Sequence, residues 1–252
     1  MIHLNGSGAA RASGKGNSLV DCAVAAVKEH IAKHAMRVGD TVPGEAFFAE
    51  QIGVSRSVMR EAFGVLGALG VLDVANGRRP RVGALDSGVL AEAFGHGVAT
   101  AQISVADVWD VRRAIEVTTV KLAAAQRSNA QASTILSLAE AMATDADDAG
   151  RRAAHDVALH LAIAEASGNP LFGKIVASFG PLMEVAVPTA WRTRTKRPQR
   201  EAMIECHLAI ARAIATQDVK AAASAMEAHF RASIRDMLLS GFNRGVNGED
   251  AG

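Results

Sequence analysis

A three-residue turn between two short helical segments constrains the fold of this chain more than any other feature of its sequence. Apolar residues recur at helical spacing over residues 18–34, Glu45–Ile52 is predicted as a second short helix, and a third begins at Ser55. In the turn Gly53-Val54-Ser55, the glycine suits a positive φ angle and the serine suits the residue that caps a helix. The pattern predicts a compact helix-turn-helix.

The residues after this turn predict how the unit is completed. The third helix ends at Gly70, and its apolar face consists of Met59, Ala62, Phe63, Leu66 and Leu69. The segments 71–74 and 81–83 then flank Asn76-Gly77, a dipeptide typical of tight hairpin turns. Three helices followed by a two-stranded wing define a winged helix-turn-helix, which we expect over residues 18–83.

The rest of the chain carries helical patterns only. Tyrosine is absent and aromatic residues make up 4% of the 252 residues, a composition that favours helices over sheets. Helices are predicted over residues 87–95, 104–127, 130–143, 150–167, 170–187, 199–215 and 218–241. Asn169-Pro170 and Pro188 mark two of the breaks, because proline disfavours helix before it. The predicted fold is therefore mainly α, with an all-α bundle of six or seven helices behind the winged unit.

These patterns divide the chain into successive segments. Residues 1–17 are rich in Gly, Ser and Ala, and we expect a disordered tail there instead of a signal peptide. The winged unit takes residues 18–83, a linker with a short helix takes 84–103, and the helical domain takes 104–241. Residues 242–252 are expected to form a flexible tail.

Charge and cysteine content restrict the compartment and the mode of nucleic-acid binding. The whole chain has a net charge of +1, too low for a general nucleic-acid coat protein. Up to Gly83, however, ten Lys/Arg against seven Asp/Glu give about +3, enough for a local DNA-binding patch. Cys22 and Cys206 form no disulfide framework, so we expect reduced thiols in the cytoplasm. No apolar run reaches the roughly 18 residues that a membrane span needs, so no membrane is expected as a partner.

The start of the third helix carries the side chains that a reader of the DNA major groove needs. Arg56 and Arg60, four residues apart, project from one face of the helix, and arginine is the usual reader of guanine. The expected contacts to double-stranded DNA are Ser55, Arg56, Ser57 and Arg60 on the helix and Asn76, Gly77 and Arg78 on the wing. The alternative for either arginine alone is a solvated helix charge.

This stretch resembles the head of the GntR superfamily of bacterial transcription regulators. The resemblance lies in residues 40–45, Ile52–Ala62 and Gly70-Val71-Leu72, within a match over about 18–83. It implies the helix contacts named above and a wing contact at Gly77 and its neighbours. Family members often carry a basic or polar residue just after the helix-opening Glu, where this chain has Ala46, so one DNA contact is expected to be missing.

Four residues in the second half of the chain form a candidate set of metal ligands. Asp156 and His160 are four residues apart on one helix and share a face, while His207 and His229 fall on the last two helices. One carboxylate and three imidazoles suit a divalent metal such as Zn or Ni and leave coordination positions open. The alternative for each histidine alone is an ordinary core or surface residue.

A second resemblance strengthens this set. Asp156-x-x-x-His160, then residues 166–171 and finally His207 and His229 resemble the FCD sensor domain of the FadR subfamily of GntR regulators, over about 104–240. The resemblance implies that these four residues bind the metal inside a helical bundle. His155 is not part of the family pattern and points about 100° away from Asp156 on the helix, so it is expected to be a bystander.

The same resemblance singles out Arg112 as an effector contact. Arg112 and Glu116 match an Arg-x-x-x-Glu on the first sensor helix, and an arginine fork grips a carboxylate well. We expect Arg112 to hold a small organic acid whose carboxylate also meets the metal; the alternative is a surface salt bridge with Glu116. The basic run 191–197 is expected to be a solvated loop, or alternatively to guard the effector cavity. Residues 85–90 resemble the linker of members that sense sugar acids, which favours such an acid.

Together these features predict a metabolite-responsive transcription regulator, and not an enzyme. A homodimer is expected to bind a near-palindromic operator and repress transcription until the acid shifts the helical domain. One alternative is a constitutive DNA-binding regulator with a purely structural metal. Another is a metalloenzyme, for which no general base or nucleophile motif accompanies the four ligands.

Overall fold

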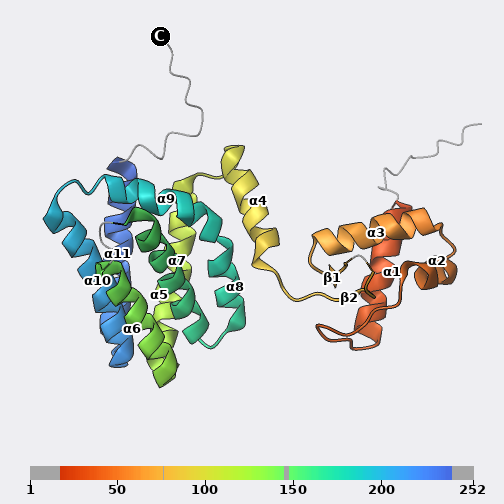
Figure 1. The fold of residues 1–252 in the computed structure, drawn as a ribbon, viewed down its shortest axis with the longest axis horizontal. Coiled ribbons are helices and arrows are strands. Elements are labelled where there is room, and N and C mark those ends of the chain that lie inside the picture. The colour runs from red at the N-terminus through yellow and green to blue at the C-terminus, as the bar shows by residue number, and fades with distance from the viewer. Residues whose placement is uncertain (1–17, 76, 145–147, 240–252) are drawn as a thin grey trace, which may run out of the picture. The chain divides into compact units, whose positions relative to one another are not determined.

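The computed structural model describes residues 18–75, 77–144 and 148–239, and the chain divides into two compact units between Leu85 and Asp86. Figure 1 shows the helices of the two units. Each unit has its own hydrophobic core. The prediction of a mainly α chain with a winged helix-turn-helix followed by an all-α domain is confirmed.

The N-terminal unit contains three helices and a two-stranded sheet. Its elements are α1 (Leu19–Lys33), α2 (Glu45–Ile52), α3 (Arg56–Ala68), β1 (Leu72–Asp73) and β2 (Arg81–Val82). The strands are antiparallel, with Leu72 opposite Val82, and Thr41 adds an isolated bridge to Arg81. The wing is therefore tied to the segment that precedes α2 as well as to α3.

Local capping explains where the helices of this unit begin. Ser18 caps α1 and forms a capping box with Asp21, so two otherwise unpaired backbone N–H groups find partners. Gly53 takes the left-handed conformation (φ 71°), and the Ser55 side chain accepts a hydrogen bond from the backbone N–H of Val58. The turn inferred from the sequence is thus present, and it fixes the first turn of α3.

The buried face of α3 holds the N-terminal unit together. Met59 and Leu66 are fully buried and pack in one cluster with Phe48 of α2 and Leu72 of β1. Leu69 was expected on the same face, but it is 48% exposed. The reason is its position: Leu69 is the residue that caps α3, and Gly70 (φ 67°) then turns the chain towards β1.

The second unit is a helical bundle entered through one shorter helix. Its helices are α4 (Ser87–Ala99), α5 (Val105–Gln126), α6 (Asn129–Thr144), α7 (Ala149–Ala166), α8 (Pro170–Ser178), α9 (Gly180–Arg192), α10 (Arg197–Ala215) and α11 (Val219–Leu239). Among the described residues, α5–α11 make the seven-helix bundle, in which α5 packs on α7 and α11 and α10 packs on α11 and α6. The α4 helix packs against α8 and α9. Ser104 and Asp107 form a capping box that opens α5.

The predicted single helix over 170–187 is wrong. The chain bends by 57° between α8 and α9, with Phe179 at the corner. Pro181 lies in the first turn of α9, where its missing N–H costs nothing and its ring disfavours helix before it. Pro188 was expected to end a helix but lies inside α9, which continues because Met183 and Ala190 on either side are buried in the bundle.

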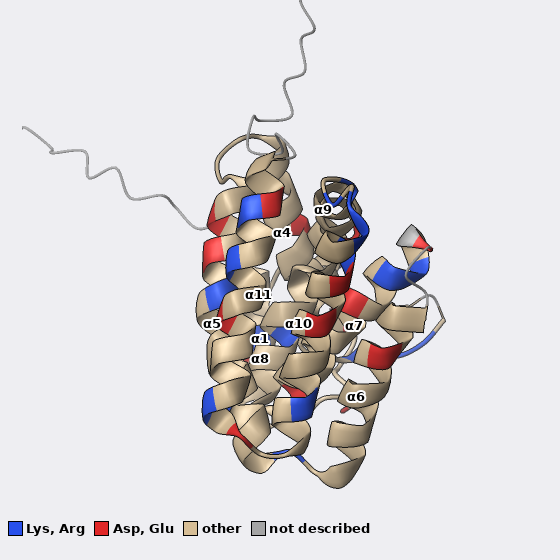
Figure 2. Cartoon of the chain, turned by 90° about the vertical axis from the view of Figure 1, so that its left-hand side faces the viewer, with Lys and Arg blue, Asp and Glu red and all other residues tan. Residues whose placement is uncertain are grey.

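The outer surface of the helical unit carries charges of both signs. Figure 2 shows basic and acidic residues interspersed around α5 and α11, where Arg113 and Glu227 form an ion pair at 3.2 Å. In the part of the chain that the structure describes, no single helix is long and apolar enough to cross a membrane. The bent pair α8 and α9 passes that test only when the two helices are taken together.

The wing offers a test of the N-terminal fold at Gly83. A Cβ atom at this position would lie 2.1 Å from the backbone oxygen of Gly70, so Gly83→Ala forces the two segments apart. We expect it to destabilise the N-terminal unit by about 1–3 kcal/mol, as overpacking does. In Gly64→Ala, the matched control on α3, the new Cβ meets nothing within 4 Å, and we expect a gain of up to about 1 kcal/mol.

Amide hydrogen exchange of the full-length variants measures both effects. Exchange in β1 and β2 should accelerate in Gly83→Ala and slow or stay unchanged in Gly64→Ala. Equal protection of the hairpin in the two variants would contradict the close approach of Gly83 to Gly70.

Candidate metal centre and nucleic-acid interface

Three helices bring the four expected metal ligands to one place in the bundle. Asp156 and His160 come from successive turns of α7, His207 comes from α10 and His229 from α11. The nearest nitrogens of the three imidazoles all lie within 4.8 Å of one another. All four side chains are buried, with at most 7% of any of these residues exposed. The structure therefore joins residues that are more than seventy positions apart in the sequence.

The Asp156 carboxylate lies against this cluster. Its Oδ1 atom is 2.9 Å from Nε2 of His207, but the angles do not make a directed hydrogen bond. Burial by itself raises the pKa of the Asp156 carboxyl, but contact with His207 and the nearby charges of His160 and His207 hold that pKa well below its usual value. The carboxylate is therefore ionised at neutral pH and available as a ligand.

Hydrogen bonds orient two of the imidazoles. His207 Nδ1 donates to the backbone oxygen of Met203 at 3.0 Å, and His160 Nδ1 donates to the Glu116 carboxylate. With Nδ1 protonated, the lone pair of Nε2 is free on each ring, and both Nε2 atoms are buried with no hydrogen-bond partner. His229 Nδ1 is also buried without a partner, and burial together with His207 and His160 lowers the pKa of His229.

These three buried imidazole nitrogens without hydrogen-bond partners indicate whether the site suits a metal ion. Buried polar atoms in proteins are nearly always paired, and a cluster of three unpaired imidazole nitrogens beside a carboxylate is the donor set of a divalent cation. Metal-bound histidines commonly donate their other nitrogen to a carboxylate or a backbone oxygen, as His160 and His207 do. The residues present fit a divalent metal of the Zn or Ni type.

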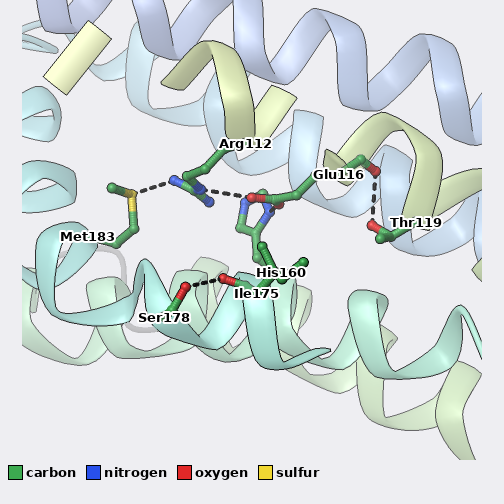
Figure 3. A network of polar contacts seen from close by, with 7 residues as sticks. All are labelled: Arg112, Glu116, Thr119, His160, Ile175, Ser178 and Met183. Atoms are coloured by element: carbon green, nitrogen blue, oxygen red, sulfur yellow. Dashed lines mark hydrogen bonds and ion pairs between the residues drawn. The ribbon is translucent and has the colours of Figure 1, made fainter. Parts of the chain in front are cut away.

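A buried ion pair extends this network to α5. Arg112 Nε donates to Glu116 Oε1 at 2.8 Å, while Glu116 Oε2 accepts from His160 and Arg112 also touches the Met183 sulfur (Figure 3). The pair expected as an alternative at the surface does exist, but both residues are less than 5% exposed. Burial alone raises the pKa of the Glu116 carboxyl, but Arg112 and His160 hold it below its ordinary value.

A small cavity lies between the candidate metal ligands and α9. We call it the inner cavity, and it has a volume of about 30 Å³, room for roughly two water molecules. Its walls include Trp109, Arg112, Asp156, Trp191, Arg194 and His229. Arg112 therefore borders the cavity and the metal ligands together, as an effector contact requires.

Two residues of the basic run 191–197 close this cavity. The sequence favoured a solvated loop for this run and left a guard of the effector cavity as the alternative. Trp191 and Arg194 are 6% and 5% exposed, so the solvated loop is wrong at these two residues. Arg194 pairs with Asp236 of α11 at 2.7 Å and stacks on the Trp191 ring at 4.6 Å. The signal in the sequence was the tryptophan that opens the run, a residue that is rarely left in solvent.

The candidate DNA contacts at the start of α3 are exposed together. Ser55, Arg56, Ser57 and Arg60 all face solvent, and the Arg60 side chain is 79% exposed, with only a distant ion pair to Glu45 at 3.9 Å. Ser55 also serves as the helix cap, and its hydroxyl lies 2.8 Å from that of Ser57. The cap and the first five residues of α3 thus present two arginines and two hydroxyls to solvent.

The wing tip presents a second basic group. Gly77 adopts φ 74°, the positive angle that the turn requires, and Arg78 is exposed beside Asp73 at 3.6 Å. Asn76, the other wing contact inferred from the sequence, lies outside the described residues.

A winged helix-turn-helix with an arginine-bearing recognition helix, followed by a helical unit with a buried polar cavity, defines a DNA-binding transcription regulator. Family comparisons name the group: residues 19–82 match the model "Bacterial regulatory proteins, gntR family" and residues 107–232 match the "FCD domain". The chain belongs to the GntR family of bacterial regulators and carries an FCD domain.

Individual relatives agree with this assignment. The "Glc operon transcriptional activator" of Escherichia coli K12 is 30% identical over 68% of this chain and 69% of its own length. The "HTH-type transcriptional regulator LutR" of Bacillus subtilis is 28% identical over 84% of this chain and 97% of its own. The solved structure of "Streptococcus agalactiae GntR" shares the fold, with a TM-score of 0.63 at 22% identity over 86% of this chain and 99% of that one. The relatives are transcription regulators, not enzymes.

Replacing an arginine of α3 tests the DNA interface. We expect Arg56→Ala and Arg60→Ala each to weaken binding to an operator selected from random DNA by about 1–3 kcal/mol and to relax one base preference. Arg212→Ala, which removes an exposed arginine of α10, is the matched control and should bind normally. Fluorescence anisotropy over a salt series measures both. Full affinity in Arg60→Ala would remove this residue from the contact surface.

Metal content tests the ligand assignment. Equilibrium dialysis against Zn²⁺ should show His207→Ala losing the metal, because one of four ligands is gone. His155→Ala, one residue from Asp156 on the same helix, should retain it. Glu116→Gln should keep the ligands but lower the affinity by about 10–100-fold, since the carboxylate orients His160. Full metal content in His207→Ala would exclude His207 from the site.

Proposed function

We propose that this chain is a metabolite-responsive repressor that holds a divalent metal, Zn or Ni, and a small organic acid in its helical unit. The observation that carries the proposal is the convergence of three buried, partly unpartnered imidazoles and Asp156 beside a cavity bordered by Arg112. A homodimer would present two copies of α3 to a near-palindromic operator.

The chemistry of the cavity supports an acid as the effector. Four protein ligands leave coordination positions on a divalent metal, and such a metal supplies a Lewis-acidic partner for a carboxylate oxygen. Arg112 keeps Nε on Glu116 and can offer the rest of its guanidinium to the same carboxylate. A sugar acid is proposed on the resemblance of residues 85–90 to the linker of sugar-acid sensors.

A continuous set of contacts supports coupling between this cavity and the linker. Trp191 at the end of α9 lines the cavity, and Phe179 at the start of α9 stacks on Phe94 of α4 with ring centroids 5.4 Å apart. The α4 helix begins at Ser87, directly after the boundary between the two units. A ligand that shifts α9 would therefore move the segment that leads into the DNA-binding unit, provided that it binds the two states with different affinity.

One relative is named an activator and another, the "HTH-type transcriptional repressor NanR" of Citrobacter rodentium, a repressor at 28% identity. Repression relieved by the acid is the mode that we propose for this chain. The competing function is a constitutive regulator with a purely structural metal. The observation that favours it is the small volume of the inner cavity, about 30 Å³.

A thermal-shift screen of the metal-loaded protein against small organic acids tests the proposal. A ligand that binds only the native state raises the melting temperature by mass action. We expect a selective rise for sugar acids that disappears after chelation, and release of operator DNA by the same acid. No shift with any acid, in protein confirmed to hold metal, would favour the structural metal.

A further inference from the structure

A second cavity lies directly behind the wall of the inner cavity. This outer cavity has a volume of about 260 Å³ and lies between α10 and α11, lined by Pro198, Ala202, Ala232 and their neighbours. Arg194 and Met203 line both cavities, so their side chains form the partition. Sites for small molecules usually enclose about 300–1,000 Å³, far more than the inner cavity of about 30 Å³ provides.

The partition is held by one ion pair. Arg194 Nη2 lies 2.7 Å from Asp236 Oδ2, and the guanidinium rests on the face of Trp191. The backbone of Arg194 is fixed separately, because Arg200 Nε donates to its carbonyl oxygen at 2.9 Å. The Arg194 side chain can therefore change partner while the loop between α9 and α10 keeps its position.

A second arginine, Arg235, lies close to Asp236. Arg235 Nε lies 3.4 Å from Asp236 Oδ1, and the Arg235 side chain is 70% exposed and free to move closer. Breaking a buried ion pair is costly chiefly because it leaves an uncompensated charge. Arg235 removes much of that cost, so Arg194 can release Asp236 when another acceptor enters.

The charges around the cavities indicate what kind of ligand carries that acceptor. Arg112, Arg194 and Arg235 line the two cavities, and an arginine fork grips a carboxylate well, so the acceptor belongs to an acid. Trp191 Nε1 is buried at the inner cavity without a hydrogen-bond partner, and an N–H can serve only an acceptor such as a hydroxyl oxygen.

We infer that the ligand site continues past Arg194 into the outer cavity and takes a hydroxylated acid that is long enough to reach it. The carboxylate end lies at the metal and Arg112, the hydroxyls meet Trp191 Nε1 and Arg194, and the chain of the acid extends between α10 and α11. Arg194 exchanges Asp236 for the ligand, and Asp236 turns to Arg235. This inference rests on the proposed function and adds a binding region to it.

Calorimetric titration of the Zn²⁺-loaded, full-length protein tests the length requirement. The probes are glycolate, which is short, and D-gluconate, which is long and hydroxylated. We expect gluconate to bind about tenfold tighter than glycolate, since only gluconate reaches the outer cavity. Ala232→Phe fills the outer cavity and should weaken gluconate about tenfold while leaving glycolate within about threefold. Ala221→Phe, an exposed position on the same helix, is the control and should change neither.

The exchange of partners by Arg194 has its own test. Asp236→Asn frees Arg194 from its ion pair, so it should leave the affinity for gluconate unchanged or raise it. Arg194→Met should weaken gluconate, whereas a purely structural ion pair would make both variants lose affinity alike. Circular dichroism and metal content verify that each variant is folded and loaded.

The outcomes separate this inference from the proposed function. If gluconate binds no tighter than glycolate, or if Ala232→Phe binds gluconate normally, the outer cavity is not part of the site although the protein still senses an acid. If Arg194→Met binds gluconate as tightly as the wild-type protein does, the proposed exchange by Arg194 is wrong. If no acid binds the metal-loaded protein, the inference and the proposed function both fail.

Discussion

The burial of Asp156 among three imidazoles is the constraint on which the helical unit depends. An ionised carboxylate inside a bundle is costly unless it is partnered, and each unpaired imidazole nitrogen adds to that cost. Because the four side chains come from α7, α10 and α11, a partner that satisfied them as a group would hold these three helices together. A metal that bound only the folded state at this cluster would therefore raise the stability of the bundle.

Hydrogen bonds from Arg112 and His160 to Glu116 connect the expected effector contact to the candidate metal ligands. Glu116 receives Arg112 on one oxygen and His160 on the other, so a change in the partner of Arg112 alters the group that orients His160. An acid at Arg112 and a metal at His160 would thus influence each other's affinity, and thermodynamic linkage requires the effect to be equal in both directions.

Much of the fold and part of the site could be predicted from the sequence, for identifiable reasons. Asp156 and His160 share a helix face by spacing alone, and Gly53 with Ser55 specifies a turn locally. The bend at Phe179 was missed because the helix break was assigned to Pro188. The proline that disfavours helix before it is Pro181, in the first turn of α9. The burial of Arg194 could not be predicted, since its partner Asp236 is forty-two residues away on a helix whose placement depends on the whole bundle.

The two tryptophans in the walls of the inner cavity give the protein an intrinsic fluorescent probe. The chain has two tryptophans and no tyrosine, and Trp109 and Trp191 both line the inner cavity. Intrinsic fluorescence excited near the red edge of protein absorption therefore arises from this one region and from nowhere else in the chain. Arg112 lies over the Trp109 ring, and Arg152 and Arg194 both lie over the Trp191 ring. Movement of Arg194 would therefore change the surroundings of Trp191 and the emission of the unlabelled protein.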